Sequence, residues 1–168
     1  NDVLTRFIST GKLEPKETIP SVAPSMDIQI PSSLERLIYN FEGDASSFYD
    51  QLQNEKIAKL SEESVVKLQN IFSSLSFNDE MILNEIDLFY KNYGWVIDPH
   101  TATALSSSVT FSSTLPVVGV ATASPEKFSD VISKTIDEFR VESTKNEEKY
   151  FVQKANSSLV ENTIKECL

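Results

Sequence analysis

Near the centre of the chain the sequence reads Gly94-Trp95-Val96-Ile97-Asp98-Pro99-His100-Thr101-Ala102. Gly94 is expected to end a helix, and the apolar residues 95–97 are typical of a short buried strand. Asp98 and Pro99 then form a turn into a helix of small residues, predicted over residues 101–113. A strand, a turn and a helix in this order are typical of an α/β fold.

A second unit of the same kind follows further along the chain. Residues 116–121 read Pro116-Val117-Val118-Gly119-Val120-Ala121, which is short, β-branched and almost entirely apolar, as in a buried parallel strand. Residues 122–125 form the next turn, and Pro125 suits the first position of a helix predicted over residues 126–139. Two or three strands are too few to complete a sheet for so many helices. The sequence therefore predicts an α/β layered fold whose other strands lie elsewhere.

Toward the N-terminus the pattern is helical. Asn1 and Asp2 are N-cap residues for a helix through Ile8, with Gly11 as its C-terminal stop. Prolines at positions 15, 20, 24 and 31 make residues 12–31 a loop with short extended pieces, such as residues 27–30. Further helices are predicted over residues 34–41, 46–58, 61–72, 78–93 and 162–168.

Composition excludes several classes of function. The 168 residues carry a net charge of −10, and a field of that sign repels the phosphates of nucleic acids. No apolar run reaches the roughly 18–20 residues of a membrane span. The single cysteine, Cys167, excludes an internal disulfide, and the single histidine, His100, excludes a multi-histidine metal site. We therefore expect a cytoplasmic protein with no nucleic-acid, membrane or metal partner.

The four glycines, at positions 11, 43, 94 and 119, are isolated from one another. The motifs GxGxxG, GxxxxGK[ST] and GxSxG each need two or more glycines at close spacing. A glycine-rich loop for a ligand phosphate is therefore absent from this sequence.

The first candidate site is the turn at Asp98, His100 and Thr101, because ligands of open α/β sheets bind where strands end and helices begin. His100 could hydrogen-bond a ligand there or transfer a proton. Alternatively, Asp98 caps the helix and His100 only completes the turn. The residues themselves leave both interpretations open.

Two further candidates come from the other turns. Thr122 is the first polar side chain after the predicted strand 116–121, so its hydroxyl either points at a ligand or caps the next helix. Ser25 and Asp27 flank a methionine in a proline-bounded loop. There they either contact a ligand or form a turn with side-chain hydrogen bonds to the backbone.

Four blocks of the chain resemble a known family, in the family's own order. The blocks are NDVLTRF at residues 1–7, APSMDI at residues 23–28 with PSSLERL at residues 31–37, DPHTA at residues 98–102 and ATASPEKF at residues 121–128. They resemble the C-terminal half of threonine synthase of the fungal and bacterial type. The chain departs from the family pattern at Ser33, where the family has Asn, at Leu34 (Phe), at Ser124 (His) and at Glu126 (Ala).

The resemblance implies a fold type II enzyme dependent on pyridoxal 5′-phosphate (PLP), similar to tryptophan synthase beta, of which residues 1–168 form the helix-rich C-terminal portion. This family converts O-phospho-L-homoserine and water to L-threonine and phosphate. In this fold a neutral Ser or Thr hydroxyl meets the pyridine nitrogen, and Thr122 is the matching residue. The other active-site candidates in the matching blocks are Ser25, Asp27, Asp98, His100 and Thr101.

The family's Schiff-base lysine and its loop for the cofactor phosphate lie upstream of the NDVLTRF block. The resemblance therefore implies a fragment with no catalytic residue of its own, inactive alone, whose partner is the N-terminal half of the same protein. A hypothesis from another class is a non-catalytic threonine-synthase-like module that binds a ligand or another protein. The DPHTA block and Thr122 favour the enzyme, and the departures at Ser33 and Leu34 and at Ser124 and Glu126 leave room for the second hypothesis.

Overall fold

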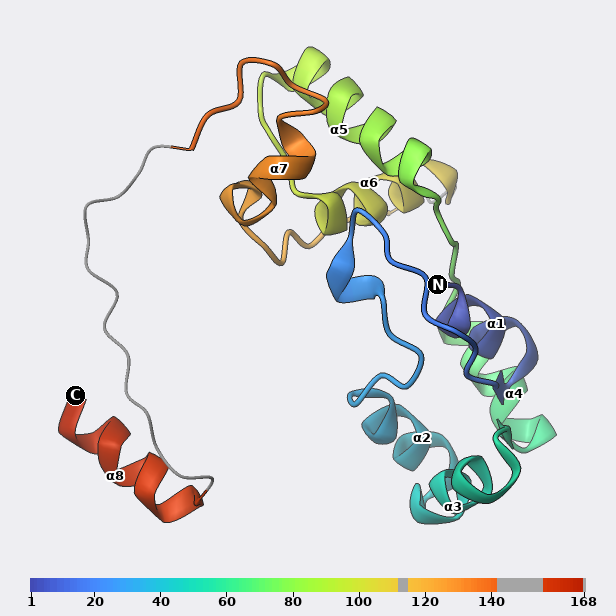
Figure 1. The fold of residues 1–168 in the computed structure, drawn as a ribbon. Coiled ribbons are helices and arrows are strands. Elements are labelled where there is room, and N and C mark those ends of the chain that lie inside the picture. The colour runs from blue at the N-terminus through green and yellow to red at the C-terminus, as the bar shows by residue number, and fades with distance from the viewer. Residues whose placement is uncertain (112–114, 142–155, 168) are drawn as a thin grey trace.

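The computed structural model describes residues 1–111, 115–141 and 156–167, which are mostly helical. In Figure 1, α1 to α4 form one group of helices, α5 to α7 form a second group, and α8 lies apart from both. The elements are α1 (Val3–Thr10), β1 (Lys12–Leu13), η1 (Pro24–Met26), α2 (Leu34–Glu42), α3 (Ser46–Glu55), β2 (Ala58–Lys59), α4 (Glu62–Ile71), α5 (Asp79–Tyr93), α6 (Pro99–Thr110), η2 (Pro125–Phe128), α7 (Ser129–Ile132) and α8 (Ser157–Cys167).

The first group packs α1 to α4 around a closed apolar core. Phe7 of α1 is fully buried and meets Phe48 of α3 edge to face, with ring centroids 6.1 Å apart. The short strands β1 and β2 pair antiparallel, with Leu13 opposite Ala58. This pairing joins the end of α1 to the segment before α4, and both paired side chains are buried in the core.

The second group packs α5 against α6, with α7 beside them (Figure 1). Its core consists of Ala23, Ile82, Ile86, Ile97, Ala102, Ile132 and Ile136. Ala23 comes from the proline-rich loop, so this core also fixes part of residues 12–31. The loop is held again where the backbone N–H of Val22 donates to Asp79 at the start of α5, over 3.2 Å.

The predicted starts and stops of several helices are confirmed. Gly11, Gly43 and Gly94 follow α1, α2 and α5 with positive φ angles of 68°, 75° and 70°, the left-handed conformation of a helix stop. Ser61 and Asn78 cap α4 and α5 through side-chain oxygens that accept backbone N–H groups. Gly11 is also required by packing, because a Cβ at that position would overlap the side chain of Val65.

Both predicted strands are wrong for the described residues. Residues 95–97 and 116–121 belong to no strand, and the single described sheet is the antiparallel pair β1–β2. A β-strand forms only where a neighbouring strand pairs with it through backbone hydrogen bonds. No described segment pairs with residues 95–97 or 116–121 in this way. Residues 116–121 are instead exposed, and Val118 keeps 81% of its surface accessible.

Other boundaries also differ from the prediction. The helix predicted over residues 46–58 ends at Glu55, because Lys56 has a φ of 61° and Ala58 pairs with β1. In place of the helix predicted over residues 126–139, the chain forms η2, the four-residue α7 and turns. Ile132 and Ile136 are both buried in the second core, and β-branched residues lower helix propensity in this region.

Three further helix ends also differ from the prediction. α6 begins at Pro99, two residues earlier than predicted, α8 begins already at Ser157, and α4 ends at Ile71. The predicted end of the small-residue helix at residues 112–113, and Leu168, lie outside the described residues. Among the helices that the structure describes, none is long and apolar enough to span a membrane.

Candidate functional site

The carboxylate of Asp98 organises the N-terminus of α6. Asp98 is the N-cap residue of this helix and retains only 1% of its accessible surface. Its Oδ1 atom accepts the backbone N–H of His100 at 2.9 Å and lies 2.9 Å from the Nδ1 atom of the His100 ring. Its Oδ2 atom accepts the hydroxyl of Thr101. Three donors therefore converge on one buried carboxylate, which compensates for its removal from water.

The His100 side chain links this helix end to a distant loop. Its Nε2 atom accepts the backbone N–H of Ser25 over 3.1 Å. Because an amide N–H can only donate, Nε2 carries no proton, and the ring proton sits on Nδ1, where it is donated to Asp98. The ring also lies against Phe128 of η2, with centroids 4.8 Å apart. Both ring nitrogens of His100 are thus engaged within the protein.

The structure brings four of the candidate residues together, namely Ser25, Asp98, His100 and Thr101. The interpretation in which Asp98 caps the helix describes the geometry well, and His100 does more than complete the turn, since it binds a loop 75 residues away in sequence. Ser25 takes part through its backbone, and its side chain is exposed. No local signal in the sequence pairs Ser25 with His100.

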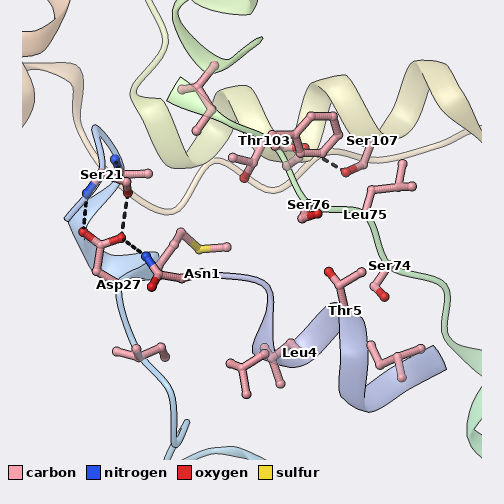
Figure 2. Close-up of a pocket in the computed structure, with 18 residues that line it drawn as sticks. Asn1, Leu4, Thr5, Ser21, Asp27, Ser74, Leu75, Ser76, Thr103 and Ser107 are labelled. Carbon is pink, nitrogen blue, oxygen red and sulfur yellow. Dashed lines mark hydrogen bonds between the residues drawn. The ribbon is translucent and has the colours of Figure 1, made fainter. Parts of the chain in front are cut away.

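Asp27 lies in a neighbouring pocket rather than in this cluster. Its Oδ1 atom accepts the side-chain amide of Asn1 and the hydroxyl of Ser21, both at 2.7 Å, and its Oδ2 atom accepts the backbone N–H of Ser21 at 2.8 Å. Figure 2 shows these bonds at one end of the pocket. Asp27 therefore bonds back to Ser21 and Asn1, and the chain at Ser25 is the exposed 3-10 turn η1 rather than the expected buried turn.

The pocket has a volume of about 330 Å³ and lies between α1, the loop around Asp27, residues 74–77 and α6 (Figure 2). Most of its lining is apolar, and none of the described residues that line it is a lysine or an arginine. A second pocket adjoins it and shares Asn1, Ser21, Ser76 and Phe77. These walls suit a small ligand with an apolar body and hydrogen-bonding groups, but they offer no cation for a phosphate.

Sequence reasoning missed the hydroxyl groups that line this pocket, which belong to Ser21, Thr5, Ser74, Ser76, Thr103 and Ser107. Thr103 and Ser107 lie on the helix of small residues after Asp98. Small side chains on a helix leave space for a cavity next to it, and this pattern could have indicated the pocket. Thr103 donates to the carbonyl of His100 at 2.7 Å, and Ser107 to that of Thr103 at 2.8 Å. Ser74 and Ser76 carry no comparable signal, because they lie in a connection without a motif.

Thr122 is exposed and stands outside both the cluster and the pocket lining. Its hydroxyl has no hydrogen-bond partner among the residues that the structure describes. The N-cap position of η2 belongs to Ser124, whose side chain also makes no capping bond. Within the described residues, Thr122 therefore does not act as a helix cap.

Asp98→Ala is expected to destabilise the folded chain by about 3–5 kcal/mol, because it removes a cap and leaves buried donors of His100 and Thr101 unpaired. The matched control is Asn78→Ala, which removes the exposed cap of α5 and should cost about 1 kcal/mol. Urea denaturation of both variants measures the difference. Equal losses would mean that the Asp98 carboxylate is an ordinary helix cap.

Comparison with known proteins gives a consistent result. No family model matches the chain. Over 80% of its length the chain is 32% identical to a threonine synthase from Pseudomonas aeruginosa, of which it covers 30%. It is 29% identical to human threonine synthase-like 1 over 94% of its length, and it covers 22% of that protein. The chain thus spans about a third or less of the length of these curated relatives.

Solved structures agree with the sequence matches. The chain aligns over 98% of its length with PLP-bound threonine synthase from Brucella melitensis, at a TM-score of 0.79 and 25% identity, and covers 38% of that structure. It aligns with the yeast enzyme at a TM-score of 0.76 and 21% identity, covering 40% of it. The expected fold class, a helix-rich part of a fold type II PLP-dependent enzyme, is confirmed by these alignments. The chain is therefore similar, in sequence and in fold, to threonine synthases and threonine synthase-like proteins.

Proposed function

We propose that this chain is one part of a PLP-dependent threonine synthase, whose complete form converts O-phospho-L-homoserine and water to L-threonine and phosphate. The observation that supports this most strongly is the alignment of 98% of the chain with a threonine synthase that holds PLP. The 32% identity to the P. aeruginosa enzyme supports the same reaction independently of the fold. A cytoplasmic location is part of this proposal.

Thr122 is the residue of this chain that suits the cofactor. Its hydroxyl is exposed and lacks a partner among the described residues, so it is available to hydrogen-bond a pyridine nitrogen. A neutral hydroxyl does not fix a proton on that nitrogen, which suits elimination and replacement chemistry. PLP, when bound, would supply an electron sink to the reaction. The role of this chain would be to orient the pyridine ring of PLP through the Thr122 hydroxyl.

The remaining candidates have supporting roles in this proposal. Asp98 and Thr101 fix the start of α6, and Asp27 fixes the end of the pocket through Ser21 and Asn1. The pocket lining contains no lysine or arginine among the described residues. We therefore propose that the Schiff-base lysine and the groups that bind the cofactor phosphate belong to an N-terminal part of the same protein, with residues 1–168 as its C-terminal portion.

The direct test of this function compares the 168-residue chain with the complete protein. The complete protein is expected to release phosphate from O-phospho-L-homoserine and to form L-threonine, whereas the chain alone should do neither. The chain alone should also lack the absorbance of lysine-bound PLP, because the groups that hold the cofactor are proposed to lie elsewhere.

Two results would contradict the proposal. Lysine-dependent PLP absorbance in the 168-residue chain would show that the cofactor site is complete without another part. A complete protein that binds PLP or an amino acid and yet leaves phosphohomoserine intact would instead support the non-catalytic, threonine-synthase-like alternative.

In the complete protein, Thr122→Val is expected to lower kcat about 10- to 100-fold while the protein remains folded. The change keeps the shape of the side chain and removes only the hydroxyl offered to the ring, an interaction of about 1–3 kcal/mol. Steady-state kinetics measure the effect.

The matched control for this variant is Thr18→Val, since Thr18 is also exposed in a loop and makes no hydrogen bond through its hydroxyl with the described residues. This control should keep the wild-type kcat. Wild-type kinetics for Thr122→Val would mean that another group meets the pyridine nitrogen.

A further inference from the structure

We propose that His100 is a positioning residue, which latches the pocket wall formed by residues 24–28 to α6 and takes no part in proton transfer. The kinetic part of this inference rests on the proposed function, whereas its structural part does not. The latch consists of the hydrogen bond from the backbone N–H of Ser25 to the Nε2 atom of His100.

The position of Ser25 explains why this bond matters. Ser25 lies in the first turn of η1, where backbone N–H groups have no partner within the helix. Other bonds of this wall stay within the loop or reach Asn1, as those of Asp27 do. Among the described residues, the Ser25–His100 bond is the hydrogen bond that joins residues 24–28 to α6. His100 therefore supplies the hydrogen bond that ties this wall to α6, beside the packing of Ala23 in the second core.

The latch connects two walls of the same pocket. Met26, Asp27 and Ile28 follow Ser25 directly and line one side. Thr103 and Ser107, which follow His100 on α6, line the other side, as Figure 2 shows. A bond between Ser25 and His100 thus fixes the distance between the loop and the helix at the edge of the cavity. A ligand in this pocket meets walls that are already in place, which lowers the cost of binding.

The ring is also held in the one protonation form that the latch needs. Asp98 accepts the Nδ1 proton, which leaves Nε2 as an acceptor directed at the Ser25 N–H. The His100 residue keeps only 9% of its accessible surface, and Phe128 lies against the ring. A general acid or base needs one ring nitrogen free for a reactant, and neither nitrogen of His100 is free.

Two amide variants separate the two ring nitrogens. In His100→Gln the terminal amide oxygen reaches the position of Nε2, so the variant retains an acceptor for the Ser25 N–H. In His100→Asn the amide nitrogen replaces Nδ1 as a donor to Asp98, and the shorter side chain leaves Ser25 without an acceptor. His100→Asn therefore breaks the hydrogen bond to Ser25, whereas His100→Gln retains it and serves as the conservative control.

The first readout is amide hydrogen exchange of the 168-residue chain. Exchange at Ser25 should be about tenfold faster or more in His100→Asn than in the wild type, and close to wild type in His100→Gln. The amide of Asp27 is the internal control, because it donates to the carbonyl of Pro24 within η1 and should change little. Equal exchange at Ser25 in all three proteins would overturn the latch.

The second readout is kcat/KM of the complete protein with O-phospho-L-homoserine. Positioning predicts near wild-type values for His100→Gln and a loss of about tenfold for His100→Asn. Equal losses of about 100-fold or more in both variants, with the Ser25 amide of His100→Gln still protected, would show that His100 transfers protons and would overturn the proposal. If the wild-type complete protein has no activity, the proposed function fails, and amide exchange still decides the latch.

Discussion

The buried carboxylate of Asp98 is the constraint on which the candidate site depends. A carboxylate with 1% exposure is stable only if donors replace the lost water, and here three donors from His100 and Thr101 do so. One of these donors is the ring of His100, whose orientation and proton position follow from that bond. The ring then accepts the backbone N–H of Ser25, so a single charge at the start of α6 helps to hold a loop far away in sequence.

Local chemistry accounts for the parts of the fold that the sequence predicted well. Helix caps and stops depend on a few neighbouring residues, so Ser61, Asn78 and the glycines that follow α1, α2 and α5 could be identified without knowing the rest of the structure. Non-local pairing accounts for the errors. Residues 116–121 have a strand-like sequence, but no described segment pairs with them. Ala58, predicted as the end of the helix that starts at Ser46, instead pairs with Leu13 of β1.

The same division applies to the candidate site. The helix start at the DPHTA block could be predicted, because helix capping is local, although the strand predicted before it does not form. The bond between Ser25 and His100 could not, because it joins residues 75 positions apart. The pocket beside Asp27 was also beyond prediction, since its walls come from four separate segments. Thr122 was selected by its place after an apolar run, and its hydroxyl, which has no partner among the described residues, is compatible with the proposed contact to the cofactor.

The protonation form of His100 is the most direct test of this account. The chain has one histidine, so ¹⁵N-labelled histidine gives ring signals that need no further assignment. The account predicts that Nδ1 carries the proton and that Nε2 has the chemical shift of a hydrogen-bonded acceptor. A proton on Nε2, or on both nitrogens, in the folded chain at neutral pH would contradict it, because the Ser25 N–H would then have no acceptor.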